Sequence, residues 1–243
     1  MCQEGVHRCF SRLQGDDLPC TIQDMNKPLP STESIRVPLE SWLKAAYDSL
    51  IESGIDAVKV LPLAKKLNIS RTSFYWYFED RDALLTALIA LWKNKNTDNL
   101  VKQSRAYAES LSEAILNVFD CWLNTELFDS QLEFAMRSWA LQSEEVSTEI
   151  LSADELRIDA LANMFGRFGF NPLQARTRAR ALYLTQIGYI SMKMAEPTEY
   201  RMRYIPEYLK IFTGVEPEPR ELERFYSRHG FTLCDFDFSK DNA

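Results

Sequence analysis

Residues 61–85, LPLAKKLNISRTSFYWYFEDRDALL, constrain the fold of this chain more strongly than any other segment. Leu63 and Leu67 have the spacing that places two apolar side chains on one face of a short helix. Asn68 tolerates the left-handed backbone conformation that ends a helix, and Ser70 is a favourable N-cap because its hydroxyl accepts a backbone N–H. The segment therefore predicts two short helices around a turn of about three residues, followed by a longer helix.

An amphipathic helix precedes this pair. Its apolar residues recur at helical spacing and are Leu39, Trp42, Leu43, Ala46, Tyr47 and Leu50. Pro38 provides a start signal and Gly54 a stop signal. Three helices with a tight turn between the second and third are typical of a helix-turn-helix DNA reader, in which the last helix enters the major groove.

The same residues resemble the TetR family of transcriptional regulators. The family pattern is a helix and turn, then Ser or Thr, a short recognition helix, a Tyr-x-(His/Tyr)-Phe box, a basic residue and a Leu-rich helix. The matching residues are Leu63-Ala64, Asn68-Ile69-Ser70, Tyr75-Trp76-Tyr77-Phe78, Arg81 and Leu84-Leu85. Asn68 and Thr72 stand where the family often has Gly, so the base that is read at Thr72 does not carry over from the family.

Candidate base contacts lie at the start of the recognition helix, where Ser70 and the first turn would face the major groove. They are Arg71, Thr72, Ser73 and Trp76. Arg71 can bond bidentately to guanine or bind a phosphate, and Thr72 can offer its methyl group to thymine. Trp76 is expected to be exposed if Phe74 and Phe78 face the core, and an exposed Trp favours DNA contact.

The resemblance also implies phosphate contacts. Tyr75, Tyr77 and Arg81 match family positions that contact the DNA backbone, and Lys59 stands where the family often has a Thr with that role. Lys65 and Lys66 either contribute to the same basic surface or form a solvated face.

The net charge of −7 is unevenly distributed along the chain. Residues 36–81 contain seven basic and six acidic residues, whereas residues 82–243 contain eighteen basic and twenty-four acidic ones. A small basic patch on an acidic body fits a protein that touches DNA at one end only. It argues against a protein that coats DNA over its whole surface.

Nearly all of the remaining chain has the apolar periodicity of helices, so we expect an all-α protein. The expected parts are a disordered N-terminal arm (1–35), a three-helix helix-turn-helix DNA-binding domain (36–80), a helical effector and dimerisation domain (81–214) and a C-terminal extension (215–243) with one short helix. Asn171-Pro172 should open a long helix to about Met194, and a last long helix should cover residues 199–212.

Two features of the second domain bear on partners. Trp122, Phe134, Trp139, Tyr183 and Tyr189 either line an effector pocket or belong to the core. The late helices carry small and apolar residues on one face, a pattern that permits the intersubunit four-helix bundle of family homodimers.

Other functional classes have little support. The two His residues stand in the terminal segments and the five Cys form no CxxC pair, so we expect no catalytic site, metal or other cofactor. The apolar runs are too short for a membrane span, and no signal peptide is recognisable, which indicates a cytoplasmic protein. We therefore expect a transcriptional regulator that binds a near-palindromic duplex as a homodimer, a repressor released by a small molecule. The alternative is an effector-independent DNA-binding protein of the same fold, with an architectural or recruitment role.

Overall fold

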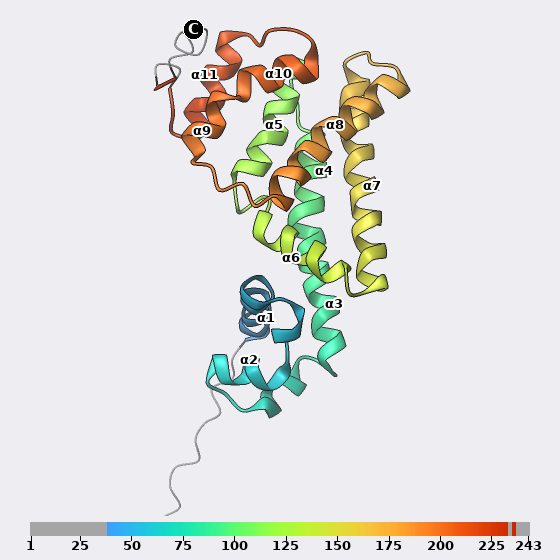
Figure 1. Ribbon diagram of the computed structural model, residues 1–243, viewed down its shortest axis with the longest axis vertical. Helices are drawn as coiled ribbons and strands as arrows, with labels where there is room; N and C mark the ends of the chain where they lie inside the picture. The colour runs from blue at the N-terminus through green and yellow to red at the C-terminus, as the bar shows by residue number, and fades with distance from the viewer. Residues whose placement is uncertain (1–37, 233–234, 237–243) are drawn as a thin grey trace, which may run out of the picture. The chain divides into compact units, whose positions relative to one another are not determined.

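The structure is a computed structural model that describes residues 38–232, 235 and 236. The predicted arm at residues 1–35 lies outside this range. The described residues form helices, turns and bends and no strand, so the predicted all-α fold is confirmed (Figure 1).

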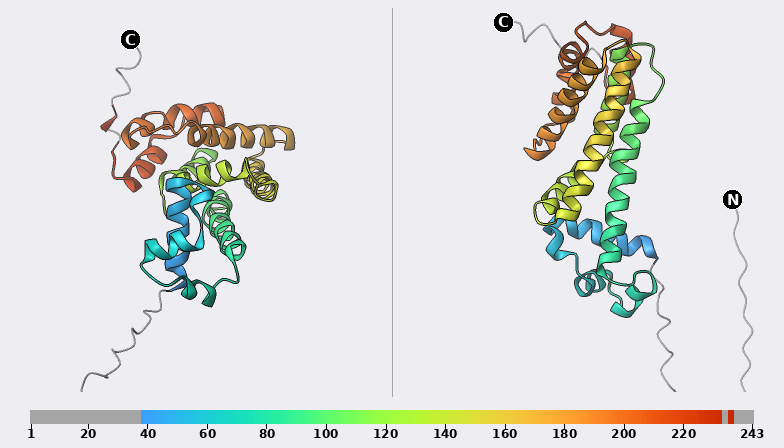
Figure 2. Two further views of the ribbon diagram at one scale, coloured as in Figure 1. Left: turned by 60° about the horizontal axis from the view of Figure 1, so that its bottom comes forward. Right: turned by 90° about the vertical axis from the view of Figure 1, so that its right-hand side faces the viewer.

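The α-helices are α1 (Leu39–Ser53), α2 (Val60–Leu67), α3 (Arg81–Trp92), α4 (Asn99–Ser104), α5 (Leu111–Leu123), α6 (Ser130–Ala140), α7 (Glu144–Arg167), α8 (Pro172–Ser191), α9 (Thr198–Arg203), α10 (Ile205–Thr213) and α11 (Pro219–Arg228). Two 3₁₀-helices, η1 (Ile55–Ala57) and η2 (Arg71–Trp76), flank α2, and a π-helix, η3 (Lys93–Asp98), joins α3 to α4. Figure 2 shows α3, η3 and α4 as one continuous helical segment that runs alongside α7.

An aromatic core holds the head, which we define as α1, η1, α2 and η2. Phe74 of η2 packs edge-on against Trp42 of α1 with ring centroids 5.2 Å apart, and it stacks on Phe78 at 5.3 Å. All three rings are buried. Because Phe74 contacts both neighbours, the short helix η2 has a fixed position against α1.

The core of the head continues into the body. The apolar cluster that contains Trp42 and Phe74 also contains Leu88 of α3, Trp139 of α6 and Val146 of α7. A second cluster is formed by α4, α5, α8 to α11 and the second half of α7. The helices on the two sides of the expected boundary between residues 80 and 81 therefore share one apolar core.

The C-terminal part differs from the prediction at Tyr204 and agrees with it in one short helix near the end. Residues 199–212 form two helices that break at Tyr204, since Pro206 cannot donate the backbone hydrogen bond that would continue α9. Residues 219–228 form α11, whose Phe225 and Tyr226 are fully buried, and the Tyr226 hydroxyl donates to the Met202 carbonyl at 3.1 Å. This segment packs into the body core and contains the short helix that the sequence predicts, while the domain bound at residue 215 stays a prediction.

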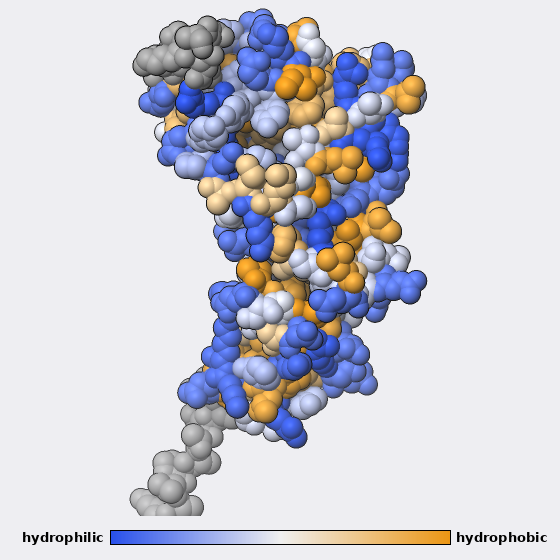
Figure 3. All heavy atoms as spheres, viewed as in Figure 1, coloured by the Kyte–Doolittle hydropathy of each residue, from blue (hydrophilic) through white to orange (hydrophobic). Residues whose placement is uncertain are grey.

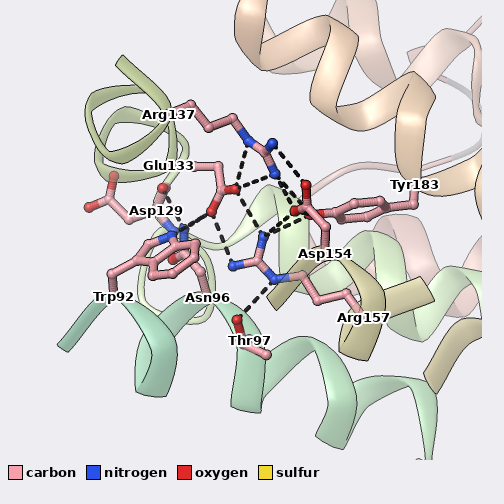
Figure 4. Close-up of polar contacts among 9 residues, drawn as sticks. All are labelled: Trp92, Asn96, Thr97, Asp129, Glu133, Arg137, Asp154, Arg157 and Tyr183. Atoms are coloured by element: carbon pink, nitrogen blue, oxygen red, sulfur yellow. Dashed lines mark hydrogen bonds and ion pairs between the residues drawn. The ribbon is translucent and has the colours of Figure 1, made fainter. Parts of the chain in front are cut away.

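A buried polar network joins η3, α6, α7 and α8 (Figure 4). Its members are Trp92, Asn96, Thr97, Asp129, Glu133, Arg137, Asp154, Arg157 and Tyr183. Glu133 and Arg157 are both fully buried, and Nη1 of Arg157 lies 2.9 Å from Oε1 of Glu133. Trp92 Nε1 and Asn96 Nδ2 donate to the other carboxylate oxygen of Glu133 at 2.7 and 2.9 Å.

The same network extends to α8. Arg157 donates to the Tyr183 hydroxyl at 2.8 Å, and this hydroxyl donates to Asp154 at 2.6 Å. Arg137 bridges the two carboxylates, since its Nη2 lies 2.9 Å from Glu133 and 2.5 Å from Asp154. Every charge in this interior site therefore has a hydrogen-bonded partner, which is the condition for burying it.

We expect this network to weaken in acid. Burial by itself raises the pKa of Glu133, but the charges of Arg157 and Arg137 outweigh it and lower the pKa from 4.5 to about 2. A carboxyl group whose pKa is lowered by folding contributes stability that is fully present above pH 4.5 and is lost as the pH falls towards 2. The contribution is of the order of 3 kcal/mol.

Urea unfolding at a fixed protein concentration between pH 7 and pH 2.5 measures this loss. The matched control is Glu133→Gln, which has no titrating group at this site. The variant should lose less free energy of unfolding between pH 4.5 and 2.5 than the unmodified protein. Parallel curves for the two proteins would contradict the assignment to Glu133.

Candidate nucleic-acid interface

The turn between α2 and η2 has the geometry that its sequence predicts. Asn68 adopts the left-handed conformation, with φ 55° and ψ 45°, and its N–H bonds to the Lys65 carbonyl at 3.1 Å. The N–H of Ile69 bonds to the Ala64 carbonyl at 3.0 Å, which satisfies a second carbonyl at the end of α2. Ser70 then caps the next helix, because its Oγ accepts the N–H of Thr72 at 3.2 Å.

The helix η2 presents one face outward. Arg71, Thr72, Tyr75 and Trp76 are exposed, and 48% of the Trp76 surface is accessible. Phe74 lies on the opposite face and is fully buried. The predicted exposure of Trp76 is therefore confirmed, while its contact with DNA stays a prediction.

Ser73 lies on the inner face of η2, which does not suit its predicted role as a base reader. Only 7% of its surface is accessible, and its hydroxyl donates to the Ser70 carbonyl at 2.7 Å. In the short repeat of a 3₁₀-helix this residue lies with Phe74 on the buried side. Ser73 stabilises the first turn of η2 from within.

Arg81 makes contacts that the family resemblance does not imply. Its Nε donates to the Val58 carbonyl at 2.6 Å and its Nη2 to the Ile55 carbonyl at 3.1 Å. These bonds fasten the loop that precedes α2 to the first turn of α3. Tyr77 is half-buried against the core of the head, whereas Lys59 and Ser70 are exposed.

Positive charge on this surface is largely free of internal partners. In the part of the chain that the structure describes, Lys59, Lys65 and Arg71 form no ion pair, while Lys66 pairs with Glu52 of α1 at 3.0 Å. All three unpaired cations are exposed. Such side chains can bind phosphate without first breaking an internal contact.

A cavity of about 280 Å³ opens in the body between α5, α8, α9 and α10. Two of the five predicted pocket aromatics, Trp122 and Tyr189, line it. The other three lie elsewhere: Phe134 packs on the body core, Trp139 belongs to the cluster shared with the head, and Tyr183 belongs to the buried polar network. The lining also includes Thr185, Gln186, Arg201, Tyr204 and Tyr208, which were not predicted.

Two other kinds of site have no support in the described residues. No group of three or more His, Cys, Asp or Glu side chains there is arranged to hold a metal ion. No helix in the same residues has the length and apolar character needed to cross a membrane.

Comparison with known sequences identifies the head. A sequence model described as "Bacterial regulatory proteins, tetR family" matches residues 43–88. Over 53 residues the chain is 42% identical to the tetracycline repressor protein class D of Escherichia coli and to the class H protein of Photobacterium damsela subsp. piscicida. Each match spans 22% of this chain and 24% of the repressor.

Solved structures share the fold over most of the described chain. GusR of Salmonella enterica superposes with a TM-score of 0.54 at 16% identity and covers 79% of this chain and 98% of its own. AmtR of Mycobacterium smegmatis gives 0.53 at 16% identity over 84% and 99%, respectively. A putative TetR-family regulator of Mesorhizobium loti gives 0.50 at 15% identity over 78% and 95%. At these identities the likeness establishes the fold alone.

Proposed function

Because the helix-turn-helix head of this chain belongs to the TetR family, we propose that the protein is a transcriptional regulator that binds a near-palindromic DNA operator as a homodimer. The observation that carries this proposal is the outer face of η2. Arg71, Thr72 and Trp76 are exposed there at the start of a short helix, next to cations without internal partners. A buried aromatic core holds that face in place.

The side chains divide into two proposed roles. Arg71, Thr72 and Trp76 read bases, since they project from the helix that would enter the major groove. Lys59, Ser70, Tyr75 and Tyr77 bind the DNA backbone through ammonium, hydroxyl and backbone N–H donors. Arg81 holds the loop before α2 in position through its two carbonyl contacts, and any phosphate contact it makes is additional.

The proposed dimer interface lies on α8 and α10. Leu184 of α8 and Ile211 of α10 are 49% and 70% exposed, which leaves apolar surface without an intramolecular partner. Gly188, one helical turn after Leu184, allows close approach of a second helix. On the face drawn in Figure 3, hydrophobic residues occur between hydrophilic ones over the part of the molecule that α8 to α10 form.

We also propose that the protein is a repressor released by a small molecule. The cavity in the body supports this choice over an effector-independent architectural protein. A DNA-binding protein that responds to no effector does not require a small-molecule cavity.

Selection of duplexes from a random pool tests the DNA-binding proposal. We expect enrichment of two inverted half-sites whose centres lie about one helical turn, roughly 34–36 Å, apart.

Arg71→Ala should relax the preference at one base position per half-site, or weaken binding to all sequences if Arg71 binds phosphate. Lys59→Ala should weaken binding to all sequences and reduce the slope of log affinity against log salt by about one for each phosphate that Lys59 neutralises.

Lys102→Ala is the matched control for Lys59→Ala, because Lys102 is exposed on α4 in the body, outside the head. It should leave both the affinity and the salt slope unchanged. Enrichment of no duplex, or equal effects of the two lysine variants, would contradict the proposed interface.

A further inference from the structure

The cavity in the body is mainly apolar, with aromatic side chains on several sides. Trp122 of α5, Leu182 and Tyr189 of α8, and Tyr208 of α10 belong to its lining. Its volume of about 280 Å³ is close to the lower end of the range for small-molecule sites, about 300–1,000 Å³. These dimensions suit a compact ligand with one or two rings.

Arg201 of α9 supplies a positive charge to this lining. Its guanidinium lies over the Tyr189 ring, 5.3 Å from the ring centroid. In the described part of the chain it has no carboxylate within ion-pair distance, although Glu196 also lines the cavity. Burial lowers the pKa of Arg201, and the more distant charge of Glu196 opposes this only in part.

Two further polar groups of the lining lack a partner. Nε1 of Trp122 is buried and has no hydrogen-bond acceptor among the described residues. The amide of Gln186 likewise makes no side-chain hydrogen bond in that part of the chain. Because Trp122 Nε1 has almost no accessible surface, Gln186 is the one of these two groups that a ligand can reach.

We propose that this cavity binds a small organic carboxylate with an aromatic body. The carboxylate faces Arg201, which can hold two carboxylate oxygens with parallel N–H donors. The ring packs among Trp122, Tyr189 and Tyr208, whose faces offer apolar surface. Gln186 is the polar group available to accompany Arg201.

The charge of the ligand follows from the donors. Arg201 is a donor only and has no carboxylate of the described residues within ion-pair distance, so it favours an anion, whereas Glu196 of the lining would attract a cation. A neutral aromatic molecule would fill the apolar part but would leave the guanidinium unpaired. An inorganic anion would satisfy Arg201 and leave the apolar part of the cavity unfilled.

This inference specifies the effector of the proposed repressor, and its biological meaning rests on that proposed function. Ligand binding is measurable without DNA, so the two proposals fail separately. A carboxylate that binds without releasing the operator would leave the cavity assignment standing and would contradict the proposed release. If the protein binds its operator but no carboxylate, the DNA-binding proposal stands and the cavity assignment is contradicted.

Isothermal titration calorimetry of the full chain with four probes tests the cavity. The probes are benzoate, phenylacetate, indole-3-acetate and 1-naphthoate, each compared with its primary alcohol and its primary amine of the same ring system. We expect at least one carboxylate to bind more tightly than both counterparts. Arg201→Met should weaken this carboxylate about ten- to hundredfold, the factor that a hydrogen bond to a charged group supplies, and should barely change the alcohol.

Arg105→Met is the matched control, since Arg105 is exposed at the end of α4 and does not line the cavity. It should bind the carboxylate as the unmodified protein does. Failure of all four carboxylates to bind, tighter binding of the amines, or equal affinity in Arg201→Met would overturn the proposal.

Discussion

Arg157→Met is expected to destabilise the fold by about 3–5 kcal/mol, since it leaves the carboxylate of Glu133 buried without its main partner. Both residues are fully buried, and Arg157 also donates to Thr97 and Tyr183. Chemical unfolding at fixed protein concentration would measure the loss. It should take the form of a lower unfolding midpoint with an unchanged denaturant slope.

The control for this variant is an exposed arginine that also pairs with a neighbouring helix. Arg176 of α8 pairs with Asp159 of α7 at 2.6 Å on the exposed surface, so Arg176→Met should change stability little. The double variant Arg157→Met/Glu133→Leu removes both buried charges. Its destabilisation should fall short of the sum of the two single effects by about 1–3 kcal/mol. Additive effects would show that the two residues do not act as a buried pair.

Gly188→Glu is expected to convert the proposed dimer to monomers. Operator affinity should fall by roughly two to four orders of magnitude, because the two DNA-binding heads would no longer be linked. A side chain at Gly188 meets no atom of its own chain, since nothing lies within 4 Å of the position of an added Cβ. Its effect should therefore come from the partner subunit, against which the carboxylate would be buried without a partner charge.

Gly166→Glu is the matched control, because Gly166 of α7 is also helical, is exposed and has no neighbour within 4 Å of an added Cβ. Sedimentation velocity and operator titration should show the control as a dimer with full affinity. If Gly188→Glu behaves in the same way, the interface does not include this part of α8.

The head could be predicted well because its signals are local. The left-handed Asn68 and the cap at Ser70 depend on residues within a few positions of each other. The inward position of Ser73 was missed, because the prediction did not include the tighter repeat of a 3₁₀-helix, which the structure has at η2. Local patterns therefore define which residues form the reader and are less exact about which of them face outward.

The buried network was not predicted, because its partners are far apart in the sequence. Glu133 and Arg157 are 24 residues apart, and no local rule pairs them. One signal was present: Arg157 occupies the apolar stripe of α7, four residues after Ala153 and four before Leu161. A charged residue in such a stripe indicates a buried partner, although its identity depends on the packing of α6 against α7.

The cavity was predicted in part for a similar reason. Aromatic residues at helical spacing look the same in the sequence whether they fill a core or line a hollow. Trp122 and Tyr189 line the cavity, whereas Trp139 and Tyr183 do not. The break at Tyr204, by contrast, was readable from Pro206.

The helix α8 places two sites side by side, because Leu182 lines the cavity and the next residue, Tyr183, belongs to the buried network. Loss or gain of one residue earlier in α8 would rotate both positions by about 100°, so that neither would keep the neighbours it has now. A substitution on the cavity side leaves that register intact. Variants that accept different ligands should therefore arise by substitution in α8. Insertions and deletions should be tolerated only in the loops at the ends of this helix.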